Sequence, residues 1–184
     1  LTDTGGIAGD FAEKGVATDE KISVGVESTQ ADNTATYAVP LSYGLPMKLL
    51  GGEEFLNLSA YLAYATNDTT DENGVGDSSV GAEYYFENSD MIFKTAVDIK
   101  LSTGDEDKGL GTGATDLGFS AAVRKRMGEM GYKGSAGYTF TGERDFGGGA
   151  KFEYGNIFVL GGGAEFKLMP QLWAGADLAF VHTA

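Results

Sequence analysis

The stretch FKTAVDIKL, residues 93–101, decides the fold. Its residues alternate in character: Phe93, Thr95, Val97, Ile99 and Leu101 take one face of an extended chain, and Lys94, Ala96, Asp98 and Lys100 take the other. A strand reads this way when one face is apolar and the other meets water. A helix would not hold two lysines and an aspartate at this spacing beside an unbroken apolar row. The stretch is therefore predicted to be a two-faced β-strand.

The same period of two recurs along the chain. The further segments that show it are residues 22–26, 35–43, 56–64, 79–86, 117–124, 132–141, 158–166 and 172–180. Together with residues 93–101 they give about nine strands, most of them close to the roughly 9–11 residues that cross a bilayer at a tilt.

Soluble β-sandwiches and lipocalin-like barrels also alternate, but their polar faces carry many charges. Here the polar positions are mostly Gly, Ser, Thr and Ala. The apolar rows end in aromatic residues such as Tyr43, Tyr64, Phe86 and Tyr132, as interfacial girdles do. We therefore predict an all-β fold, an antiparallel up-and-down transmembrane β-barrel of about 10–12 strands when complete. The expected location is the outer membrane of a Gram-negative cell.

Composition excludes several classes of protein. The formal net charge of −14 disfavours nucleic-acid binding, and the absence of Cys excludes a disulfide framework and a thiolate metal site. No apolar run is long enough for a spanning helix. No signal peptide is visible at Leu1, so we expect a mature or trimmed form.

The expected organisation is a polar lead-in over residues 1–20 and a barrel domain over residues 21–184. A barrel of this kind closes with an even number of strands. Either C-terminal strands are missing, or residues 1–20 or 149–154 supply a tenth strand.

The connections differ in length. Residues 67–76, 103–114 and 142–156 form long acidic or Gly-rich links, whereas residues 87–90, 128–131 and 169–171 form short ones. Long links outside and short turns in the periplasm are typical of outer-membrane barrels. Residues 149–154 read as a loop extension or as an extra strand. The link 44–54, which opens with a predicted turn at YGLP, is longer than its periplasmic position predicts.

No catalytic site is expected. The lone histidine, His182, has no partners for a catalytic triad, and the glycine clusters GLGTG (109–113) and GGG (161–163) lack the features of a phosphate loop. No cofactor is expected. Calcium is the one metal considered, with Asp105, Asp107 and Asp116 as weak candidates, because their spacing matches no EF-hand.

The inner face is the predicted functional surface. The predicted pore-lining residues are Glu27, Glu83, Lys94, Asp98, Lys100, Arg124, Lys133, Glu165, Lys167 and Asp177. Lys94, Lys100 and Arg124 are expected to form a basic group facing Glu83 and Asp98. In a wide barrel such residues line a passive channel, and in a narrow barrel they pair and fill the interior. The alternatives are thus a channel for small solutes, a non-conducting structural barrel, or a surface protein whose acidic loops bind partners. The expected partners are outer-membrane lipid and small solutes. A homo-oligomer is also compatible with the sequence.

Four segments resemble an outer-membrane barrel family named for a proposed transporter of the phenol-degradation meta-pathway. They are GVGDSSVGAEYYF (74–86), VDIKLSTGD (97–105), GLGTGATDLGFS (109–120) and GSAGYTFTG (134–142), with YGLP (43–46) as a weaker match. The chain departs from the family at Ser102, where the family usually has Pro, and the family barrel is longer. The resemblance implies an envelope barrel that passes small, often aromatic compounds.

Overall fold

The computed structural model describes residues 20–31, 34–145, 151–153, 155–169 and 172–183. These residues form thirteen strands and no helix, which confirms the prediction of an all-β, antiparallel fold. Among them, no helix has the length and apolar character to cross a bilayer. The predicted lead-in, residues 1–20, lies outside the described residues except for Glu20.

The strands follow the predicted segments closely. In chain order they are β1 (Lys21–Val24), β2 (Glu27–Ala31), β3 (Thr34–Met47), β4 (Glu53–Asn67), β5 (Glu72–Val75), β6 (Ser78–Glu87), β7 (Met91–Leu101), β8 (Asp116–Met127), β9 (Met130–Phe140), β10 (Glu143–Asp145), β11 (Lys151–Glu153), β12 (Ile157–Met169) and β13 (Leu172–Thr183).

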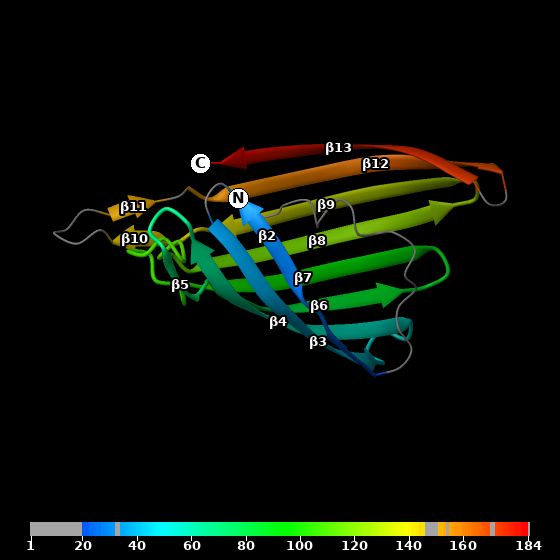
Figure 1. The fold of residues 1–184 in the computed structure, drawn as a ribbon. Helices are drawn as coiled ribbons and strands as arrows, with labels where there is room; N and C mark the ends of the chain where they lie inside the picture. The colour runs from blue at the N-terminus through cyan, green and yellow to red at the C-terminus, as the bar shows by residue number, and fades with distance from the viewer. Residues whose placement is uncertain (1–19, 32–33, 146–150, 154, 170–171, 184) are drawn as a thin grey trace.

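Eleven strands form one sheet in which neighbours along the chain are neighbours in space. Its path is β1-β3-β4-β6-β7-β8-β9-β12-β13, and β2 and β5 extend it beside β3 and β4. Every pairing in it is antiparallel. Figure 1 shows a strongly curved sheet, in which β3 and β4 run obliquely to β12 and β13, which lie along the top of the view. β1 and β13 are its two edges.

Pro40 explains why the first strand is split in two. β1 and β2 pair with β3 in one continuous register, since Val24 faces Leu41 and Glu27 faces Ala38. The break falls opposite Pro40, which has no N–H to donate to the ladder. Only the Gly25 N–H to Pro40 carbonyl bond, 3.0 Å long, crosses the gap.

The connections correct two sequence predictions. YGLP is no turn, because β3 continues through it to Met47, and Gly44 is needed where the Phe55 ring occupies the space of a Cβ. The link therefore shortens to residues 48–52. The link 67–76 also shortens, since β5 pairs with β4. The link 142–156 carries the separate β10–β11 hairpin, which fits the predicted extension, although residues 149, 150 and 154 lie outside the described part.

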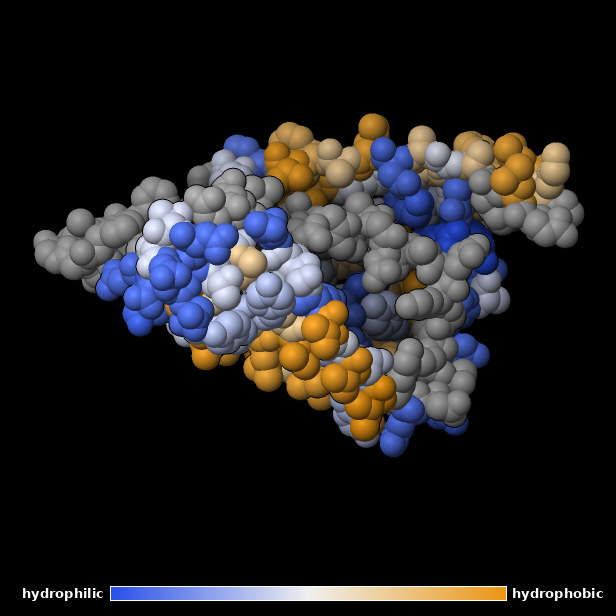
Figure 2. Space-filling view, viewed as in Figure 1, coloured by the Kyte–Doolittle hydropathy of each residue, from blue (hydrophilic) through white to orange (hydrophobic). Residues whose placement is uncertain are grey.

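The register gives the sheet two faces, which we call the inner face, carrying Lys94 and Asp98, and the outer face, carrying Val97. Large apolar side chains of the outer face are exposed, for example Leu62 (54%), Phe119 (47%) and Phe180 (58%). Among the described residues, no large side chain is fully buried. In Figure 2 orange residues follow the outside of β3 and β4 and cover β12 and β13, while blue side chains lie in the hollow between them. The buried apolar residues of the described part are mostly alanines, with Phe55, Leu110 and Val159 as the larger ones.

Candidate functional site: the inner face of the sheet

The inner face holds all ten predicted pore-lining residues. The pairing registers place Glu27, Glu83, Lys94, Asp98, Lys100, Arg124, Lys133, Glu165, Lys167 and Asp177 on this one face. Alternation in sequence thus assigned each side chain to its face. Their partners along the face depend on strand register and differ in part from the prediction.

Most of these charges are joined in ion pairs. Lys94 Nζ lies 2.6 Å from Glu83 Oε1, and Lys100 Nζ lies 2.6 Å from Asp116 Oδ2. The predicted contact between a basic and an acidic group is therefore found in the Lys94–Glu83 pair. Lys100 and Arg124 pair instead with Asp116 and Glu165, so the three bases do not act as one basic group. Tyr85 supports the first pair by donating to Glu83 Oε2 at 2.9 Å.

Two further ion pairs reach across an intervening strand. Arg124 on β8 donates to Glu165 on β12, with an Nε to Oε1 distance of 2.9 Å, and the pair crosses β9 at Gly131. Lys133 on β9 reaches Asp177 on β13, with an Nζ to Oδ1 distance of 2.9 Å, and crosses β12 near Gly163.

Asp98 makes none of these ion pairs. It lies between the Glu83–Lys94 and Lys100–Asp116 pairs, and its Oδ1 rests over Gly81. Its cross-strand row is otherwise built of small, hydroxyl or apolar residues: Ser23, Ser42, Ser59, Gly81, Gly118, Thr139, Ile157 and Thr183. Asp98 is therefore the one charged side chain in a row of otherwise uncharged residues.

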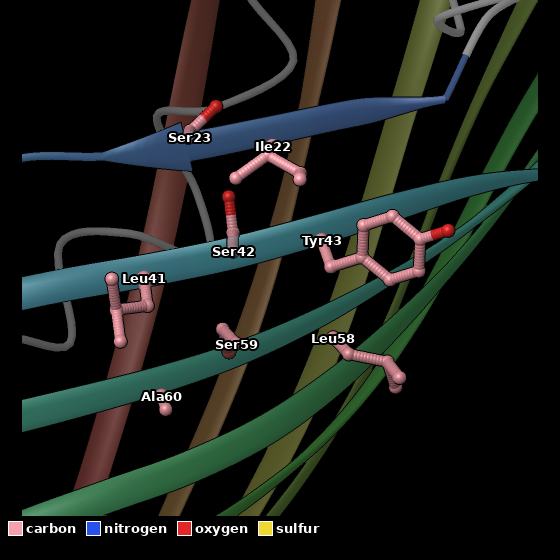
Figure 3. Close-up of a pocket in the computed structure, with 8 residues that line it drawn as sticks. All are labelled: Ile22, Ser23, Leu41, Ser42, Tyr43, Leu58, Ser59 and Ala60. Carbon is pink, nitrogen blue, oxygen red and sulfur yellow. The ribbon is translucent and has the colours of Figure 1, made fainter.

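The serine end of this row borders a pocket of about 350 Å³ on β1, β3 and β4. Figure 3 shows Ser23, Ser42 and Ser59 following one another across the three strands, with Ile22, Tyr43 and Leu58 beside them. The register puts the serines on the inner face and these apolar residues on the outer face. The pocket lies at the β1 edge of the sheet, and its polar lining consists of the three serines.

A second polar cluster, at the end of the sheet with the long links, was not foreseen. Asp77 accepts hydrogen bonds from the Thr112 N–H and hydroxyl, both 2.8 Å, and from the Gly104 N–H at 3.2 Å. Lys100 Nζ also donates to Thr112 Oγ1 at 2.8 Å. The signal in the sequence was GLGTGATD, which reads only as a loop until the register brings its Thr112 to Lys100.

The calcium candidates are not brought together as a metal site. Asp116 is buried and paired with Lys100, whereas Asp105 lies 3.8 Å from Lys108 Nζ. In the part of the chain that the structure describes, no group of three or more acidic or histidine side chains could hold a metal ion. His182 lies on the outer face, stacked at 6.4 Å from Phe180.

No family model matches this sequence, and no curated protein matches it.

Proposed function

We propose that the protein is an outer-membrane β-barrel that acts as a passive channel for small solutes. The observation that carries the proposal is the contrast between the two faces. The outer face exposes Leu62, Phe119 and Phe180, while the inner face carries ion pairs that are surrounded by small residues. Monomeric soluble proteins rarely expose so continuous an apolar surface. A lipid-facing wall around a polar interior requires this arrangement.

The directions of the two edge strands determine how many further strands a closed barrel needs. β2 and β13 both end beside long links, since Ala31 pairs with Thr34 and Thr183 pairs with Ile157. The two edges of the nine-strand path are therefore parallel to each other. An all-antiparallel barrel needs an odd number of further strands between them, which brings the total to an even number.

The inner face favours small solutes with little net charge. Four ion pairs balance most of its charges, and Glu27, Asp98 and Lys167, which take part in none of the four, add one net negative charge. The resemblance to the phenol-pathway family adds aromatic compounds as the proposed solute class. Weak selectivity for cations is expected, because fixed wall charge sets the local counter-ion concentration.

The test is single-channel recording of purified protein in planar bilayers. Wild type is expected to conduct with a weak cation preference, and Asp98→Asn is expected to reduce that preference in a salt gradient. Asp90→Asn, which removes a charge from a short turn, is the matched control. Conductance with a reversal potential that Asp98→Asn leaves unchanged contradicts the assignment of Asp98 to the pore wall.

A structural barrel is the second candidate, favoured by the pairing of charges on the inner face. In a narrow barrel, paired side chains fill the interior. A complete absence of conductance from folded wild type supports this candidate over the channel.

A further inference from the structure

The link between β7 and β8, residues 102–115, lies against the inner face of the sheet. Leu110 is 5% exposed, and its Cδ1 is 3.2 Å from the position of a Cβ on Gly74. Gly74 pairs with Ala65, an inner-face residue of β4. The Leu110 carbonyl lies close to Gly76, next to Ala63 and Ala65. The link therefore covers inner-face backbone that would otherwise border the interior.

A latch of polar side chains holds the link in this position. Lys100 and Asp116 are inner-face residues at the ends of β7 and β8, and Asp77 directly precedes β6. Asp77 and Lys100 both bind Thr112, and Lys100 also pairs with Asp116. Thr103 adds a bond to the Gly76 carbonyl at 2.7 Å. Because Asp77 accepts three hydrogen bonds from the link, the attachment is specific in direction and register.

The link is also compact in itself and anchored a second time. Gly104 and Gly111 touch closely enough that a Cβ on either would collide with the other's backbone. Gly109 and Gly113 have φ of 69°, which favours glycine. Between β4 and β5, the Thr70 hydroxyl donates a hydrogen bond to the Lys108 carbonyl at 3.1 Å. Figure 1 shows this green link beside β5, at the end that also carries β10 and β11.

We propose that residues 102–115 form a fixed constriction at the mouth of the channel and set the largest solute that enters. This inference rests on the proposed function. Two anchors and a buried contact argue for a fixed constriction, since a mobile lid would have few buried contacts and exposed bonds. Asp107, in the same link, is exposed.

The test compares wild type with the double variant Asp77→Asn, Thr112→Val, which breaks the latch. Asp107→Asn is the control, because it also removes one carboxylate charge, at an exposed position of the link. Leu110→Ala is a second variant that leaves the polar latch whole. All are first shown to be folded by heat-dependent gel mobility. Single-channel conductance and exclusion of polyethylene glycols of graded size are then measured.

If the link is the constriction, the latch variant and Leu110→Ala should conduct about twofold more than wild type and admit larger polymers, because a pore conducts through its narrowest section. Asp107→Asn should keep the wild-type polymer cut-off. Wild-type conductance with the same cut-off in all variants overturns the constriction and leaves the channel standing. Conductance in the latch variant and in Leu110→Ala, but not in wild type, shows that the link blocks the path of solutes through the barrel. No conductance in any of them overturns the channel, and the constriction with it.

Discussion

Gly131 and Gly163 show how single residues shape the inner face. Each lies on the strand between two ion-pair partners, where a side chain would occupy the place of a carboxylate. A Cβ on Gly131 would collide with Glu165, and one on Gly163 would collide with Asp177. Gly161 and Gly163 of the GGG run in β12 are thus explained by Ser135 and Asp177, which lie where their Cβ atoms would be, whereas Gly162 has only the Lys133 carbonyl within 4 Å.

Gly163→Ala is expected to destabilise the protein, whereas Gly162→Ala is not. The new Cβ at Gly163 would collide with Asp177 and lie 2.8 Å from the Ala176 carbonyl, whereas at Gly162 the nearest atom is 3.7 Å away. Overpacking of this kind costs about 1–3 kcal/mol. At the neighbouring position the change should fall within about 0.5 kcal/mol. Urea unfolding in detergent micelles measures both, and equal midpoints for the two variants would contradict the role of Gly163.

The sequence predicted the face of each charged residue but not its partner. Alternation alone placed Arg124 and Glu165 on one face, since it needs no knowledge of neighbouring strands. Their contact depends on the β8–β9–β12 register and on a glycine at the crossing point. Both conditions involve residues far apart in the chain, so local periodicity does not reveal them.

At the scale of elements, the turn between β3 and β4 is organised by a carboxylate. Glu54 is 2% exposed and accepts bonds from the N–H groups of Leu49, Leu50 and Gly51. The Tyr84 hydroxyl donates to its other oxygen at 2.8 Å. The unusual length of the predicted link 44–54 is thus resolved: β3 and β4 extend further than expected, and Glu54 closes what remains.

Glu54→Ala should lower the unfolding midpoint more than Glu53→Ala. The first change leaves three backbone N–H groups and a tyrosine hydroxyl without their acceptor. The second removes an exposed carboxylate from the neighbouring position. Thermal unfolding followed by circular dichroism makes the comparison, and Glu54→Gln should fall between the two. If both alanine variants unfold at the same temperature, the carboxylate does not organise the turn.

The strand faces give a second prediction at this scale. Val97→Arg and Leu58→Arg place a charge on the proposed lipid face and should each cost about 2–4 kcal/mol near mid-membrane. Ser120→Arg changes the inner face and should cost much less, since that side meets polar groups. Unfolding in lipid vesicles distinguishes the positions. Similar losses for Val97 and Ser120 would mean that the outer face does not contact lipid.

At the scale of the whole molecule, acidic side chains gather at one end. The two long links at that end carry Asp68, Asp71, Glu72, Asp105, Glu106 and Asp107, with Lys108 as the basic residue that joins them. Figure 2 shows the corresponding blue region at the end where Figure 1 places β5. The sequence predicted this asymmetry from link lengths. It did not predict that the 102–115 link turns back onto the inner face, because that depends on contacts with β5 and β6.

The proposed outer-membrane barrel, together with the long acidic links at one end of the sheet, predicts an orientation. Long acidic links on the cell exterior and short turns in the periplasm are typical of outer-membrane barrels. The chain has no cysteine, so single cysteines can be introduced at exposed positions without background. Thr70→Cys and Asp107→Cys should react with a membrane-impermeant maleimide on intact cells. Ser89→Cys, in the exposed turn between β6 and β7, should react only after the outer membrane is permeabilised. Ser89→Cys labelling as fast as Thr70→Cys on intact cells would contradict the orientation. Labelling of none of the three, before or after permeabilisation, would contradict the exposure of these links and of this turn.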